Sequence, residues 1–202
     1  MKQKRKSKIV ILITIFAVIF YFIIQKERIL INEVDENKIE DFDIILSKGQ
    51  SVQSKLISIF KLSIEDYSHI GMMIKENHKV FVLHSTPDGT KTNAIRFDDL
   101  QTFFDLSSVS DYTVLRYHAL SQDLRQKLKI EFERYKNSQV PFDSNFNNFD
   151  HRKIYCSELV CIIFKNSGLS SLQEFNLTKP IYPKYFFKMD GLIAINSKKT
   201  SP

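Results

Sequence analysis

One cysteine lies where a helix is expected to begin. Cys156 follows a polar loop and opens the segment from Tyr155 to Asn166, whose apolar residues recur at helical spacing. Unpaired backbone N–H groups and the dipole at a helix start favour the thiolate, the form of cysteine that attacks carbonyl carbons. The competing role is that of a small buried hydrophobe. Cys156 is therefore a candidate nucleophile.

Two histidines lie at the ends of expected strands. His69 opens the segment HIGMMI, and His84 ends the segment VFVLH. A base for a cysteine must present one ring nitrogen to the sulfur while another group holds the opposite nitrogen. His69 fits the base and His84 the orienting residue, although a histidine at a strand end can also serve only to bond neighbouring backbone. The strand register decides whether the two rings meet, and the sequence does not fix it.

Other kinds of catalytic site lack their motifs. The five histidines and two cysteines contain no HxxxH or CxxC spacing, and neither a phosphate-binding glycine loop nor G-x-S-x-G occurs. We therefore expect no metal and no cofactor. On a helix, Cys156 and Cys161 would point about 140° apart, which argues against a disulfide between them. Cysteine–histidine chemistry is the strongest enzymatic signal.

The charge of the chain is concentrated at its N-terminus. The formal net charge is +6, and the first eight residues include Lys2, Lys4, Arg5, Lys6 and Lys8. The remainder is nearly neutral, so the composition does not indicate a nucleic-acid partner.

An uncharged apolar run at residues 9–24 follows this basic cluster. A helix of that length covers roughly 24 Å, and flanking lysines and aromatic residues can extend it towards the roughly 30 Å of a bilayer core. A cleavable signal peptide is the alternative, but no A-x-A site follows. We predict a basic flank and single-pass membrane anchor at residues 1–26 and a connector at 27–38. The positive-inside rule then makes the following domain extracytoplasmic.

The rest of the chain predicts one domain at residues 39–195 and a tail at 196–202. A meander of short strands is indicated by apolar, β-branched segments between turn signals. Strands are expected at 43–46, 68–74, 80–84, 93–97 and 112–117, with a further edge strand near the C-terminus. Helices are expected at 51–60, 98–104 with Asp98 as its cap, 121–137, 155–166 and around 185–189. Residues 141–151 are expected to form a loop.

Five segments together resemble the permuted papain-like amidases, the YiiX-like branch of the NlpC superfamily. They are DFDIILSKGQSVQSKLI, DYSHIGMMI, VFVLHSTPDGT, VPFDSNF and IYCSELV, and the resemblance runs from about residue 41 to residue 190. The histidine precedes the cysteine, an order that marks the permutation. The resemblance implies an α+β, circularly permuted papain-like (NlpC-type) fold with a small antiparallel sheet packed on helices. It also implies Cys156 as nucleophile, His69 as base and Tyr67 beside the oxyanion site, with the Cys156 backbone N–H as the main oxyanion donor.

The chain departs from this family at the third polar residue. Relatives often carry a glutamate where this sequence has His84, which the resemblance makes the residue that holds the base. Glu158 matches the CSEL motif and either supports the helix start or touches substrate. Asp143, in the aromatic–Asp pair before the cysteine, is interpreted as structural.

The resemblance implies hydrolysis of an amide, or of an ester or thioester, through an acyl-enzyme. The expected substrate is an envelope peptide, murein or a lipid-linked acyl group. Two alternatives are a lipid acyltransferase or acylhydrolase of the same superfamily, and a pseudoenzyme that only binds envelope ligands.

Overall fold

The structure is a computed structural model that describes residues 13–21, 34–49, 67–87, 92–107, 109–147, 151–169 and 180–195. The helix expected at 51–60 lies outside these residues. The chain divides into two compact units, Met1–Asp35 and Glu36–Pro202, which are taken separately below.

The first unit contains a helix at residues 13–21, whose side chains are exposed. Within the described ranges, no helix combines the length and the hydropathy that crossing a bilayer requires. The other residues of the apolar run lie outside the described ranges. The membrane anchor therefore stays a prediction.

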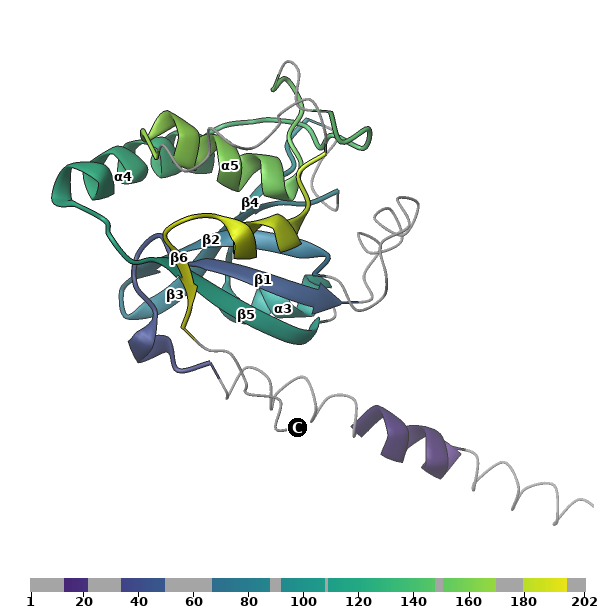
Figure 1. Cartoon of the computed structure of the whole chain (residues 1–202). Helices are drawn as coiled ribbons and strands as arrows, with labels where there is room; N and C mark the ends of the chain where they lie inside the picture. Colours follow the sequence, from purple (N-terminus) through teal and green to yellow (C-terminus); the bar gives the residue numbers. More distant parts are fainter. Residues whose placement is uncertain are drawn as a thin grey trace, which may run out of the picture. The chain divides into compact units, whose positions relative to one another are not determined.

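The second unit is built on a six-stranded antiparallel sheet with the order β4-β3-β2-β1-β5-β6 (Figure 1). Its strands are β1 (Ile44–Gly49), β2 (His69–Glu76), β3 (Lys79–Ser85), β4 (Ile95–Asp99), β5 (Val109–Tyr117) and β6 (Leu192–Ala194). These confirm the strands expected from the sequence, including the short edge strand β6. Asn77 and His78 both have positive φ, which closes the β2–β3 hairpin with a two-residue turn.

Helices cover both faces of this sheet. They are α3 (Leu100–Ser107), α4 (Gln122–Lys136) and α5 (Cys156–Asn166), together with the 3-10 turns η1 (Glu36–Lys38) and η3 (Pro183–Lys188). Helices α4 and α5 lie over one face, and α3 lies on the opposite one (Figure 1). Side chains alternate along β2 accordingly, because Ile70 packs in the core with α5 while the His69 ring stacks on Phe103 of α3.

Two caps test the expected helix boundaries. Ser121 caps α4 as expected, accepting the Leu124 N–H at 3.2 Å. The prediction that Asp98 caps the helix after β4 was wrong. Asp99 accepts the Thr102 N–H at 2.7 Å, because β4 continues through Asp99 and α3 starts at Leu100, one residue later than a cap at Asp98 would place it.

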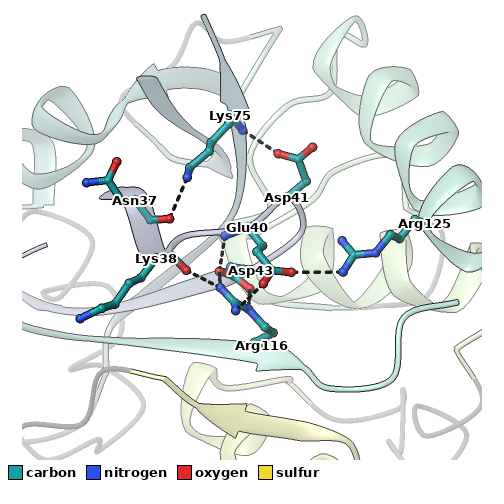
Figure 2. A network of polar contacts seen from close by, with 8 residues as sticks. All are labelled: Asn37, Lys38, Glu40, Asp41, Asp43, Lys75, Arg116 and Arg125. Atoms are coloured by element: carbon teal, nitrogen blue, oxygen red, sulfur yellow. Dashed lines mark hydrogen bonds and ion pairs between the residues drawn. The ribbon is translucent and has the colours of Figure 1, made fainter. Parts of the chain in front are cut away.

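A polar network joins the chain that enters β1 to strand β5 and helix α4 (Figure 2). The Arg116 guanidinium donates to both carboxylate oxygens of Asp43 at 2.8 Å, and to the Lys38 carbonyl at 2.6 Å. Glu40 bonds Arg116 and also Arg125. Asp43 is only 1% exposed, so the network gives a buried carboxylate a fixed counter-charge. Hydrogen bonding to Asp43 raises the pKa of Arg116.

Candidate active site

The candidate nucleophile is the first residue of α5. Tyr155 is the N-cap in extended conformation and supplies no side-chain cap, so Cys156 lies at the end of the helix where backbone N–H groups point outward. The Tyr155 hydroxyl accepts the Ile181 N–H at 2.8 Å, which fixes the residue before the cysteine. The helix start expected from the sequence is thus confirmed to within one residue.

The surroundings of the Cys156 thiol differ from the sequence-based expectation. Burial raises the pKa of Cys156 to about 11, although hydrogen bonds from Ser157 and from the backbone of Ile70 lower it in part. The helix start does favour the thiolate, but desolvation outweighs that effect. The thiol is therefore neutral at pH 7. Its contact with the Ile70 backbone places the thiol beside the start of β2, at the residue that follows His69 in the sequence.

The rings of His69 and His84 are in direct contact. His69 Nε2 and His84 Nδ1 are 2.8 Å apart, and the ring planes meet at 78°. Met72 pairs with Leu83, so Gly71 lies opposite His84 and the two histidines are diagonal neighbours on one face. Both rings are buried against Phe103. The register left open by the sequence thus brings the rings of His69 and His84 together.

Gly71 makes this diagonal contact possible. A Cβ at this position would lie 2.4 Å from Val82 Cγ1 and 3.2 Å from the Cβ of His84. Any larger residue would therefore have to displace strand β3 or the His84 side chain. The sequence motif contains this glycine, but its spatial role becomes visible only in the register.

Sequence reasoning missed a carboxylate behind the two histidines. His84 Nε2 is 3.0 Å from Asp98 Oδ2, and Arg96 donates to the same carboxylate through Nε at 2.6 Å and a terminal nitrogen at 3.0 Å. Burial raises the pKa of Asp98. The hydrogen bonds from His84 and Arg96 lower it by more than burial raises it, so the resulting pKa is about 2. The available signal was strand alternation, since Arg96 and Asp98 share the face of β4 that meets His84.

The nitrogen of His69 that turns away from His84 is unoccupied. Among the residues that the structure describes, Nδ1 has no hydrogen-bond partner although it is buried. Burial, followed by the charge of His84, lowers the pKa of His69 well below its ordinary value of 6.5. The site thus combines a neutral imidazole with a neutral thiol, and the Cys156 sulfur does not hydrogen-bond His69 Nδ1 in this structure.

Tyr67 lies two residues before His69, at the rim of the sheet. Its hydroxyl bonds Thr113 Oγ1 of β5 at 2.5 Å, and its ring contacts Phe187 and the Lys48 ammonium. These contacts hold the ring close to the start of β2. The expected contribution of Tyr67 to an oxyanion site stays a prediction.

Two acidic residues of the family motifs have structural contacts. Glu158 is buried, and its Oε1 lies 2.7 Å from His151 Nδ1 in the loop before the helix. Asp143 accepts the backbone N–H groups of Asn145 and Asn147, so it organises its own loop. These contacts support the helix-start role for Glu158 and the structural interpretation of Asp143. His151 was not singled out by the sequence.

Comparisons with known proteins agree with this architecture. The family model of permuted papain-like amidases of the YaeF/YiiX type, the C92 family, matches residues 38–200. The uncharacterised protein YiiX of Escherichia coli K12 is 31% identical over 145 residues, which cover 68% of this chain and 66% of that protein. The crystal structure of YiiX from Escherichia coli O157:H7 shares the fold with a TM-score of 0.60 at 24% identity, covering 79% of this chain and 97% of that one.

YiiX from Escherichia coli O157:H7 is described as a metalloprotein. In the part of this chain that the structure describes, no three His, Cys, Asp or Glu side chains gather closely enough to hold a metal ion. The donor set needed for a protein metal site is therefore not found among these residues.

Proposed function

Because the chain belongs to the family of permuted papain-like amidases, we propose that it is a cysteine hydrolase that cleaves an amide bond through an acyl-enzyme on Cys156. Family membership supports a hydrolase of the cysteine peptidase type. Two observations support these residue roles best: among the described residues the buried Nδ1 of His69 has no hydrogen-bond partner, and the Cys156 thiol contacts the backbone of Ile70, which follows His69.

The reaction begins with a proton transfer that accompanies attack. Cys156 and His69 are both neutral at pH 7, because burial raises the pKa of the thiol and lowers that of the imidazole. As Sγ bonds to the amide carbon, the thiol proton passes to His69 Nδ1. His69 Nδ1 then gives this proton to the leaving amine as the amide C–N bond breaks. Water next attacks the acyl-enzyme with His69 as base, and the acid and the Cys156 thiol are released.

The oxyanion of the tetrahedral intermediate needs donors at the start of α5. The backbone N–H groups of Cys156 and Ser157 are close enough to the sulfur to affect its pKa, which makes them suitable donors. Tyr67, held nearby, is the proposed additional donor or wall of the substrate site.

The proposed substrate is a peptide or acylated molecule of the cell envelope, including murein. This follows from the predicted anchor, which would hold the domain on the extracytoplasmic side of a membrane. A lipid acyltransferase or acylhydrolase is the second candidate. It is favoured by the 42% exposed apolar side chain of Phe187, which lies against Tyr67, two residues before His69.

The decisive experiment assays the purified full-length protein in detergent against murein peptides and acylated lipids. We expect release of a free amine, and an acyl adduct at Cys156 detectable by mass spectrometry. Cys156→Ala should abolish both, whereas Cys161→Ala, which removes the other buried thiol, should retain them. Activity that survives in Cys156→Ala would refute the proposed nucleophile. A Cys156 that forms no adduct with any substrate-like electrophile would favour the binding-only pseudoenzyme.

A further inference from the structure

His84 is a bridge between two partners. One ring nitrogen lies 2.8 Å from His69 and the other 3.0 Å from Asp98, while the side chain is fully buried. The Arg96 guanidinium donates to both oxygens of this carboxylate, through Nε to the Oδ2 that also contacts His84 and through a terminal nitrogen to Oδ1. A continuous line of polar contacts therefore runs from β2 through β3 to β4.

The charge of Asp98 determines where the hydrogens of both rings lie. An ionised carboxylate only accepts hydrogen bonds, so His84 Nε2 must carry its hydrogen. In the neutral ring, Nδ1 is then an acceptor, which requires the hydrogen of His69 to be on Nε2. This leaves the lone pair of His69 on Nδ1, the nitrogen that the thiol proton must reach.

We propose that Asp98 is a positioning residue for this reaction, acting through His84 to keep His69 in the tautomer that can accept the proton of Cys156. The inference rests on the proposed function, because it takes Cys156 and His69 as the reacting pair. In this arrangement His84 touches the base, and Asp98 acts on the base only through His84.

The same line of contacts determines which histidine carries the positive charge after the thiol has lost its proton. When His69 Nδ1 takes the thiol proton, its Nε2 hydrogen can pass to His84 Nδ1 along the 2.8 Å bond. One proton enters the His69 ring and one leaves it, so the imidazolium forms on His84, beside the Asp98 carboxylate. His69 is stacked on Phe103, an apolar neighbour that stabilises a charge poorly.

A purely structural ion pair is the competing explanation. Arg96 and Asp98 are two residues apart on the edge strand β4, and such pairs can serve stability alone. The two explanations differ in what they predict for each partner. If Asp98 positions His69 through His84, the rate depends on the carboxylate of Asp98, and Arg96 only supports that carboxylate. If Arg96 and Asp98 form only a structural ion pair, replacing either residue removes the same interaction.

The test measures imidazole nitrogen resonances and single-turnover acylation in the full-length protein and in Asp98→Asn. An amide at position 98 can donate to His84 Nε2, which reverses both tautomers and puts the hydrogen of His69 on Nδ1. We expect this reversal in the spectra, and a kcat lower by about 10–100-fold with KM little changed. Asp98→Glu should restore the original tautomers and most of the rate.

Two controls separate positioning from folding. Asp99→Asn removes a neighbouring charge but keeps a good N-cap for α3, so tautomers and rate should be unchanged. Arg96→Gln keeps the Asp98 carboxylate, which is still ionised at pH 7, and should also keep the tautomers and most of the rate. It provides the test should Asp98→Asn fail to fold.

Equal losses of rate in Arg96→Gln and Asp98→Asn, with unchanged tautomers in the folded proteins, would overturn the proposal. The spectra are independent of activity. If the wild-type protein has the inferred tautomers and Asp98→Asn reverses them, but Cys156 is not acylated, the proposed function is refuted while the positioning of His69 by Asp98 stands.

Discussion

The Nε2 atom of His69 and the Nδ1 atom of His84 are 2.8 Å apart, across two strands joined by a tight turn. The contact is diagonal, and it passes over Gly71, where no side chain intervenes. It leaves only one nitrogen of His69 available for chemistry, and burial keeps that nitrogen unprotonated at neutral pH. The site is thus arranged for a base that acts in its neutral form, and the predictions below follow from this arrangement.

The first prediction concerns the acid limit of the reaction. The pKa of His69 is lowered well below 6.5, so the neutral, active ring persists as the pH falls past 6.5 and is lost only at the lowered value. The single-turnover rate of acylation should therefore be flat from pH 8 to below 6.5. An acid limb centred at or above 6.5 would show that His69 is not the buried base described here.

The second prediction separates the two histidines. His84→Ala leaves the His69 Nε2 hydrogen without its acceptor, so the rate should fall by about 10–100-fold while acylation of Cys156 still occurs. His69→Ala should remove the base and leave a far lower rate. If His84→Ala is as inactive as Cys156→Ala while remaining folded, His84 itself must be considered the base.

A third prediction uses a double variant to test whether side chains at positions 84 and 98 interact. His84→Glu alone places a second carboxylate beside Asp98, and the like charges raise the pKa of one of them. The double variant His84→Glu/Asp98→Asn relieves this repulsion and puts a carboxylate next to His69. Its single-turnover rate should exceed that of His84→Glu. Strictly multiplicative effects of the two substitutions would argue against contact between positions 84 and 98.

Sequence patterns predicted well the strands and helices that carry the site residues. The strands around His69 and His84 were recognised from β-branched and apolar residues between turn signals, and α4 from its Ser121 cap and its apolar face. The start of α5 at Cys156 was also recognised. These features depend on neighbours in sequence, so local reasoning reaches them.

Features that depend on contacts between distant segments were not accessible. Two adjacent aspartates could each have capped α3, and only the end of β4 shows that Asp99 does so while Asp98 turns to His84. The helix start indicated a low pKa for Cys156, but the burial that raises it arises from tertiary packing. The strand register that joins the histidine rings is likewise a property of the folded sheet.

The membrane anchor yields the fourth prediction. Full-length protein should stay with membranes after an alkaline carbonate wash, because an uncleaved apolar helix does not depend on electrostatic attachment. Replacing both Phe16 and Ile19 by Lys should release it, since each charge near a helix centre costs about 3 kcal/mol on insertion. A soluble mature chain beginning near residue 25 in the wild type would instead establish a cleaved signal peptide.

The last prediction concerns Gly71→Ala, which tests whether the site depends on the close approach of β2 and β3. The added methyl would meet Val82 Cγ1 at 2.4 Å and the His84 Cβ at 3.2 Å, and the nearest backbone atom, the Leu83 oxygen, at 3.1 Å. Relief requires the Val82 side chain to move and strand β3 to shift slightly, and we expect this shift to carry His84 away from His69. We expect a loss of about 1–3 kcal/mol in the free energy of unfolding, measured with urea, together with a lower acylation rate.

Gly168→Ala is the matched control, because its φ of +89° makes alanine strained while nothing lies within 4 Å of the new Cβ. It should lose about 1–2 kcal/mol of stability and keep its rate, since it lies beyond the C-terminal end of α5. A Gly71→Ala protein with the acylation rate of the wild type would show that the contact between His69 and His84 is not needed for the reaction.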